Sequence, residues 1–157
     1  MSEKIDNMIA GVNTYLSKID EMVCDHFVAN KDALIDMNRQ WLSRGIRPDG
    51  SEISPQLSAM TAYEKAQGRF SNPERDFLTP DLRHTGTFYA SIDIVTDGES
   101  VEYTSSDPKW DTELSVRTPL QDWYGDVLGL SDMDWDDTVK DALNGELIDK
   151  LRLALNI

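Results

Sequence analysis

The sequence has little of several residue types that often reveal a function. Its 157 residues contain one cysteine, Cys24, and 2 histidines. One cysteine excludes a disulfide within the chain, and His26 and His84 do not have the spacing of a zinc site. No apolar run exceeds three residues, far short of the roughly 20 that a membrane-spanning helix needs. We therefore expect a soluble protein that has no cofactor and no contact with a membrane.

Motifs for enzymatic chemistry are also missing, including the glycine-rich phosphate-binding loops and the nucleophile elbow. The run Asp132-x-Asp134-x-Asp136 is similar to the start of a calcium loop. Asp137, however, stands where that loop needs glycine, and Leu143 stands where it needs a bidentate glutamate. Capping of a helix explains the same aspartates. A hydrolase has only the acid-rich composition in its favour, so we expect no enzyme.

Positive charge is scarce, above all in the second half of the chain. The chain has 15 Lys and Arg against 29 Asp and Glu, a net charge of −14, and residues 85–137 hold 13 acids and 2 bases. Binding to nucleic-acid phosphates needs clustered Lys and Arg, so sequence-specific DNA binding is not expected. Three interpretations of the acidic region stay open: a solvated face, a surface for a basic partner, and a surface that repels DNA.

Apolar residues that recur every three or four positions predict helices. The predicted helical segments are 4–23, 32–44, a segment from a Ser54-Pro55 cap to Ala66, and 132–155. Gly68 is expected to end the third segment, and Ser131 to cap the fourth with Asp134 as its capping-box partner. Whether residues 24–31 break or join the first two helices stays open.

A β-hairpin is predicted around Asp97-Gly98, a strong signal for a two-residue turn. The predicted register pairs Thr96 with Glu99, Ile94 with Val101, Ile92 with Tyr103 and Ala90 with Ser105. This register places the apolar residues on one face. On the other face it sets Asp93 opposite Glu102, and this like-charge pair suggests an exposed face that awaits a basic partner.

These elements predict an α+β fold, with N-terminal helices and a long C-terminal helix packed on a small antiparallel hairpin. We expect a single domain over residues 1–157, with residues 1–30 as a candidate helical arm. Residues 106–130 show no clear period but contain Trp110, Trp123 and Tyr124. We interpret this segment as a long, partly ordered, functional loop.

Three stretches carry a resemblance to a known family. The stretch Leu82–Ile92, LRHTGTFYASI, resembles the L-x-x-T-G-x-(L/F)-x-x-S-I pattern of tail-completion, neck and virion-morphogenesis proteins of tailed bacteriophages. Asn38–Ile46, followed by Asp49-Gly50 and Ile53, and Tyr124–Leu130 are similar to the branch from phages of gut and marine Bacteroidetes. In the family's motif Gly86 permits an unusual backbone angle, and Phe88 and Ile92 anchor the following segment in the core.

The resemblance implies an α+β virion subunit without an active site, made in the host bacterial cytoplasm. It further implies a homo-oligomeric ring, six- or twelve-fold, in the neck or head–tail connector, with portal, neck or tail proteins as partners and the genome passing through. The candidate residues for the subunit interface or the channel are Phe88, Asp93, Glu99, Glu102, Trp110, Trp123 and Tyr124. The family usually has a neutral or more basic hairpin region, so the acids of this chain are a departure.

An alternative function from another class stays open. The chain could be a small acidic inhibitor that mimics DNA phosphates and occupies a host nucleic-acid-binding protein. A mimic should expose regularly spaced acids and act as a monomer or dimer. A connector subunit should instead expose apolar or aromatic patches when alone and form a ring of fixed stoichiometry.

Overall fold

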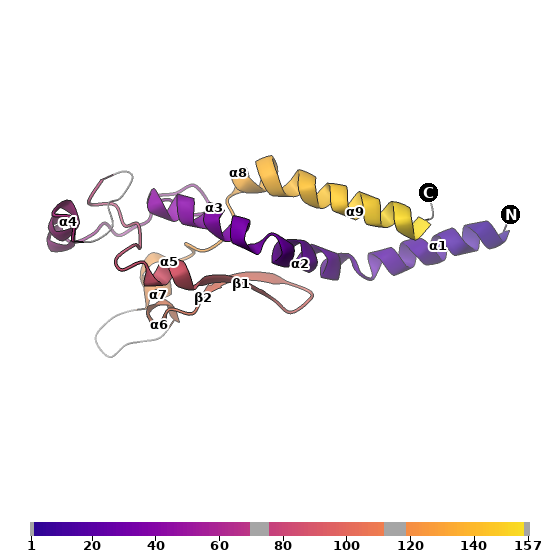
Figure 1. Ribbon diagram of the computed structural model, residues 1–157, viewed down its shortest axis with the longest axis horizontal. Coiled ribbons are helices and arrows are strands. Elements are labelled where there is room, and N and C mark those ends of the chain that lie inside the picture. Colours follow the sequence, from indigo (N-terminus) through magenta and orange to yellow (C-terminus); the bar gives the residue numbers. More distant parts are fainter. Residues whose placement is uncertain (1, 70–75, 112–118, 156–157) are drawn as a thin grey trace.

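The computed structural model describes residues 2–69, 76–111 and 119–155. Over these residues the chain has the expected α+β fold, in which a two-stranded antiparallel sheet lies along one side of the long helices (Figure 1). The elements in chain order are α1 (Ser2–Leu16), α2 (Ile19–Ala29), α3 (Lys31–Ser43), α4 (Ala59–Ala66), α5 (Thr87–Ser91), β1 (Ile92–Thr96), β2 (Val101–Ser105), α6 (Pro108–Asp111), α7 (Leu120–Tyr124), α8 (Asp132–Asp134), the π-helical turn η1 (Trp135–Val139) and α9 (Lys140–Leu155).

The molecule is elongated. Helices α1, α2 and α3 follow one another along its length, and α9 returns beside α1 and α2 (Figure 1). The hairpin lies against the opposite side of α2, with α5, α6 and α7 at its far end. The two ends of the chain therefore lie at one end of the molecule, and α4 lies at the other.

The first helical segments differ from the prediction in where they break. Helix α1 ends at Leu16 and α2 begins at Ile19, so the continuous helix expected over residues 4–23 is wrong. Asn30 alone separates α2 from α3, and its side-chain amide donates to the His26 carbonyl at 2.8 Å. Residues 24–31 are therefore helical apart from Asn30, which is the break between the two helices.

Helix α4 begins later than its sequence suggests. Ser58 is the N-cap, and its hydroxyl oxygen accepts a hydrogen bond from the Thr61 backbone N–H at 3.2 Å. The prediction that Ser54-Pro55 caps this helix is wrong, because the capping side chain that reaches the first turn is Ser58. The predicted end is confirmed, since the helix stops at Ala66 and Gly68 has a φ of +72°.

The hairpin is present, but its turn is longer than predicted. The strands pair Ile92 with Ser105, Ile94 with Tyr103 and Thr96 with Val101, so four residues, 97–100, form the turn. The Asp97 carboxylate accepts the backbone N–H of Glu99 at 2.9 Å and of Ser100 at 2.8 Å, and these hydrogen bonds, that of Glu99 first, lower the pKa of Asp97. The predicted register is therefore wrong by two residues. The predicted faces are kept, because side chains alternate with a period of two.

Helix α5 takes up the position, Ala90, at which the first strand was predicted to begin. Ala90 lies in this helix and not opposite Ser105. Gly86 precedes α5 with a φ of +87°, as the motif implied. Phe88 and Ile92 are buried, which confirms their expected place in the core.

The C-terminal helix runs from residue 132 to 155, as predicted, with the π-helical turn near its start. Ser131 caps it, because its hydroxyl oxygen accepts the Asp134 N–H at 3.0 Å. The Asp134 carboxylate accepts the Ser131 hydroxyl at 2.7 Å and the indole N–H of Trp41 at 2.5 Å. The cap therefore also ties the start of this helix to α3.

The core lies between α2, α3, the hairpin and the segment that follows α7. Leu42 and Val127 are fully buried in it. Asn38 is also buried, and its amide nitrogen donates to the carbonyls of Val127 at 3.1 Å and Gly129 at 2.9 Å. A polar residue of α3 thus fixes the segment that leads into the last helix.

Helices α1 and α9 approach each other closely at Gly11. A Cβ atom at Gly11 would lie 2.6 Å from the Ala154 carbonyl oxygen. Glycine therefore allows the two helix backbones to come together at this crossing.

Tyr103 on β2 provides a test of the packing between the hairpin and α8. Its hydroxyl is buried with no hydrogen-bond partner among the described residues. Burial, followed by the nearby Asp134 charge, raises the pKa of Tyr103. Because the folded-state pKa lies above the usual value of about 10, the free energy of unfolding falls as the pH rises from about 10 through the folded-state pKa.

We therefore expect Tyr103→Phe to raise the free energy of unfolding at neutral pH by about 1 kcal/mol, because it removes an unpaired buried hydroxyl. The loss of stability above about pH 10 should also become smaller. Urea denaturation across this pH range measures both effects, with Tyr63→Phe on the exposed side of α4 as control. A Tyr103→Phe variant that is less stable at neutral pH, or that loses stability as steeply as the original chain, would contradict this account.

Candidate functional site

A cavity of about 700 Å³ lies at the end of the molecule that is opposite the chain termini. Helix α4, the segment before α5, and helices α6 and α7 contribute its walls. Its volume is within the range of roughly 300–1,000 Å³ that is usual for ligand-binding pockets. The cavity is therefore the strongest candidate for a functional site.

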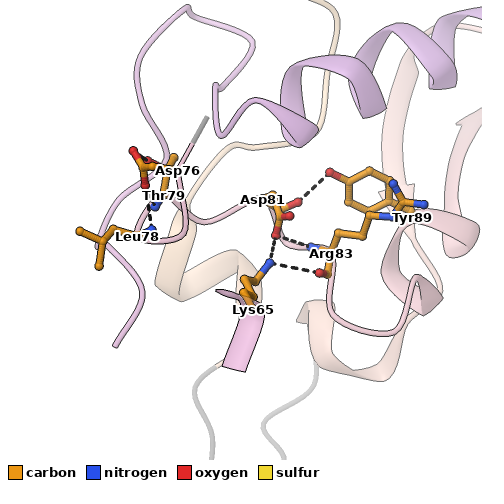
Figure 2. A network of polar contacts seen from close by, with 7 residues as sticks. All are labelled: Lys65, Asp76, Leu78, Thr79, Asp81, Arg83 and Tyr89. Carbon is orange, nitrogen blue, oxygen red and sulfur yellow. Dashed lines mark hydrogen bonds and ion pairs between the residues drawn. The ribbon is translucent and has the colours of Figure 1, made fainter. Parts of the chain in front are cut away.

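A buried ion pair stands in the wall of this cavity (Figure 2). Lys65 on α4 pairs with Asp81, and each side chain is only 3% exposed. The Lys65 ammonium also donates to the Arg83 carbonyl at 3.2 Å, and the Asp81 carboxylate accepts the Arg83 N–H at 3.0 Å. Because these extra hydrogen bonds surround the pair, the two charges hold α4 against the segment before α5.

Tyr89 connects this ion pair to the core (Figure 2). Its hydroxyl donates to the Asp81 carbonyl at 2.7 Å, and the Arg83 guanidinium lies 5.7 Å from the centre of its ring. The Tyr89 carbonyl accepts two hydrogen bonds from the Arg39 guanidinium on α3, at 2.9 and 2.6 Å. The wall of the cavity is thus fixed to the long helices.

A second carboxylate orders the chain that leads to this wall. Asp76 accepts the backbone N–H groups of Leu78 and Thr79, each at 2.7 Å, and the Thr79 hydroxyl at 3.0 Å (Figure 2). Thr79 is buried. These bonds set the direction in which the chain enters Pro80 and Asp81.

The charges around the cavity are mixed. Asp107 is buried at its wall, where one carboxylate oxygen accepts the Lys109 N–H at 3.0 Å and the other has no hydrogen-bond partner among the described residues. Burial, and then the Asp81 charge, raises the pKa of Tyr124. Arg83, His84 and Lys109 have exposed side chains at the rim.

The aromatic residues predicted for an interface differ in their exposure. Phe88, Trp123 and Tyr124 line the cavity, and Trp123 is 52% exposed. Phe88 and Trp110, however, are buried in the core with their ring centres 5.6 Å apart. In a single copy of the chain these two rings therefore bury their area against each other. Of the loop predicted over residues 106–130, the part 112–118 lies outside the described residues, and α6 and α7 form within the remainder.

The acidic residues predicted for an interface lie on the hairpin, away from this cavity. Asp93 is opposite Thr104, and Glu102 is opposite Val95, so the predicted like-charge pair is wrong. The Asp93 carboxylate pairs with Lys31 at the start of α3. The Lys31 hydrogen bond first, then the Ile94 N–H and the Lys31 charge, lower the pKa of Asp93. The basic partner of Asp93 is therefore in the same chain, while Glu99 and Glu102 are exposed.

Sequence reasoning missed the polar residues of the cavity wall, which are Lys65, Asp81 and Asp107. One signal could have found Lys65. It lies three residues after Ala62, which places both on the buried face of α4. A lysine on the apolar face of a helix predicts a buried acidic partner.

The described residues include neither a cluster of metal ligands nor a helix that could span a membrane. No group of three or more His, Cys, Asp or Glu side chains in this part of the chain is placed to hold a metal ion. The nitrogen Nδ1 of His26 lies 3.0 Å from the Glu146 carboxylate and links α2 to α9. None of the described helices combines the length and the apolar character that crossing a bilayer requires.

Comparisons with known proteins identify no relative of this chain. No family model, curated protein or solved structure matches the chain.

Proposed function

We propose that this protein is a structural subunit that assembles with further copies of itself in the virion of a tailed phage. The placement in a phage virion rests on the sequence motifs that resemble neck and tail-completion proteins. In this proposal it acts without catalysis, in the neck or head–tail connector or in completing the tail. Its partners are then portal, neck or tail proteins.

One observation carries the proposal, which is an uncovered apolar face on α1. We call this face the arm patch and define it as Ile5, Met8 and Ile9. These side chains are 52%, 40% and 54% exposed, and their spacing places them on one side of the helix. The first turns of α1 extend past the end of α9 (Figure 1). A grouped apolar surface of this kind marks a site for a partner, since isolated monomers seldom keep one uncovered.

The exposed hairpin acids fit the same setting. Glu99 and Glu102 carry negative charge on a protruding hairpin. In a ring around the genome such residues would repel DNA and so keep it from adhering to the wall. Asp93 is less suited to this role, because Lys31 neutralises its charge.

The DNA-mimic alternative receives less support from the placement of the acids. A mimic needs carboxylates that are free to meet a basic partner. Several of the acids have local roles instead, because Asp97 closes the hairpin turn, Asp134 binds Trp41, and Asp136 pairs with Lys140 at 3.0 Å. Several acids in the second half of the chain thus already bind groups of the same chain, which leaves fewer of them for a basic partner.

Native mass spectrometry of the purified chain, together with light scattering, tests the proposal. We expect an oligomer of fixed stoichiometry. A protein that stays monomeric from about 1 to 100 μM, the range in which weak specific contacts form, would contradict self-assembly. A monomer or dimer that captures a host nuclease or polymerase would favour the mimic.

A further inference from the structure

We propose that copies of this chain exchange helix α1, so that α1 of one copy packs on α9 of its neighbour. The exchange rests on the self-assembly proposed above and gives it a contact. In the exchanged form α1 and α2 are one uninterrupted helix.

Helix α1 is attached in a way that allows exchange. It packs mainly against α9, and only residues 17 and 18 connect it to α2. The contact joins the two ends of the described chain, because a Cβ atom at Gly11 would lie 2.6 Å from the Ala154 carbonyl oxygen. A terminal element with one main partner and a short connection is the kind that proteins exchange in domain swapping.

The sequence at the break between α1 and α2 favours an uninterrupted helix. Neither glycine nor proline, the residues that most often break a helix, occurs between Val12 and Ala29. The apolar residues Tyr15, Ile19 and Met22 keep the three- and four-residue spacing of one helix across the break. The chain changes direction there, and α1 lies against α9 (Figure 1). The break therefore accompanies the packing of α1 on α9.

The break also leaves backbone groups unpaired. The N–H groups of residues 19–21 have no backbone acceptor in the described part of the chain, and the N-cap residue Lys18 supplies no side-chain hydrogen bond. In an uninterrupted helix these three groups would bond to the carbonyls of residues 15–17. Residues 16–18 are exposed, so they can become helical without disturbing the core.

Two effects compete for α1. The short connection favours the α9 helix of the same chain, because it keeps the local concentration of α1 high. The additional backbone hydrogen bonds favour the exchanged form. Since α1 meets the same surface of α9 in both forms, the exchange needs no further complementary surface. A high concentration of copies therefore shifts α1 from its own α9 to that of a neighbour.

The exchange also determines how neighbouring copies lie. Helices α1 and α9 run in opposite directions (Figure 1). Because the exchanged helix keeps this direction, the two copies lie side by side with their long axes parallel. Each copy gives one helix and accepts one, so the exchange closes in a pair or continues around a ring.

Distances between spin labels on the full-length chain test the exchange. Labels are attached to Asn7→Cys on α1 and Leu153→Cys on α9, two exposed positions, in a Cys24→Ser background. The doubly labelled chain is mixed in denaturant with a large excess of unlabelled chain and refolded. In the oligomer we expect the short separation of these labels within one chain to be lost. A mixture of the two singly labelled chains should show that short separation between copies.

The control pair is Val28→Cys with Leu153→Cys. Val28 is 49% exposed on α2, outside the exchanged helix, so the separation within one chain should stay unchanged. An oligomer in which the labels at Asn7 and Leu153 keep their short separation within one chain would overturn the exchange, while self-assembly would stand. A chain that stays monomeric at all concentrations would overturn both.

A matched pair of variants tests the role of the break. Lys18→Ala and Lys18→Gly remove the same exposed side chain, but alanine is the better helix former. We therefore expect the equilibrium constant for association to be at least about fivefold larger for Lys18→Ala than for Lys18→Gly. Sedimentation equilibrium measures both constants.

Thr14→Ala and Thr14→Gly are the controls for this comparison. Thr14 is exposed and belongs to α1, which is helical in both forms. The two Thr14 variants should therefore associate equally. Equal association of the two Lys18 variants, or a difference of the same size between the two Thr14 variants, would overturn the proposal that straightening at residues 17 and 18 drives the exchange.

Discussion

Replacing Lys65 by methionine is expected to lower the free energy of unfolding by about 3–5 kcal/mol. The substitution leaves the Asp81 carboxylate buried without the ammonium that balances it, and each side chain is only 3% exposed. Methionine fills a similar volume, so the loss reports mainly on the unbalanced charge. Chemical denaturation at neutral pH measures the effect.

The matched control is Arg152→Met on α9. Arg152 pairs with Asp149 at 3.2 Å, but these side chains are 62% and 74% exposed, and exposed pairs contribute only about 0–1 kcal/mol. In the double variant Lys65→Met/Asp81→Leu we expect part of the lost stability to return, because no buried charge is then left alone. Equal losses for Lys65→Met and Arg152→Met would show that the ion pair does not hold the cavity wall.

Replacing Gly45 by alanine is expected to destabilise the protein by about 2–4 kcal/mol, from backbone strain and overpacking together. Gly45 has a φ of +69°, and its Cβ would lie 2.1 Å from Thr79 Cγ2 and 3.0 Å from the Pro80 carbonyl oxygen. Thr79 and Pro80 are buried and lead into Asp81, so the new methyl group pushes on the wall of the cavity. Thermal and chemical denaturation should both show the loss.

Gly50→Ala separates strain from crowding. Gly50 has a φ of +80°, but nothing lies within 4 Å of its Cβ position. This variant should therefore lose only the cost of a left-handed backbone, about 1–2 kcal/mol. If the two variants are equally stable, the contact of Gly45 with Thr79 is not tight.

Local patterns were sufficient to predict the last helix and the faces of the hairpin. The spacing of apolar residues predicted the last helix over residues 132–155, and Ser131 predicted its cap. The apolar face of the hairpin was also correct, even though the register was wrong by two residues. In both cases the structure depends on residues that are close together in the sequence, so the spacing of residue types is enough to predict it.

The features that were missed depend on contacts that sequence spacing does not reveal. The length of the hairpin turn depends on one side chain, because the Asp97 carboxylate takes up two N–H groups that a two-residue turn would leave to the strands. The Lys65–Asp81 pair joins two segments that only the folded chain brings together. Asp93 was expected to face a basic residue of another protein, but it forms an ion pair with Lys31 of the same chain.

The crossing of α1 and α9 at Gly11 has a consequence for how the protein is made. The ribosome completes α1 before it starts α9, yet Gly11 packs against Ala154. The nascent α1 therefore lacks its main packing partner, α9, until almost all of the described chain has been translated, and isolated helices of about this length are marginally stable in water. Contacts between such distant segments form late in folding. During that interval the side chains of α1 that later face α9 are open to chaperones.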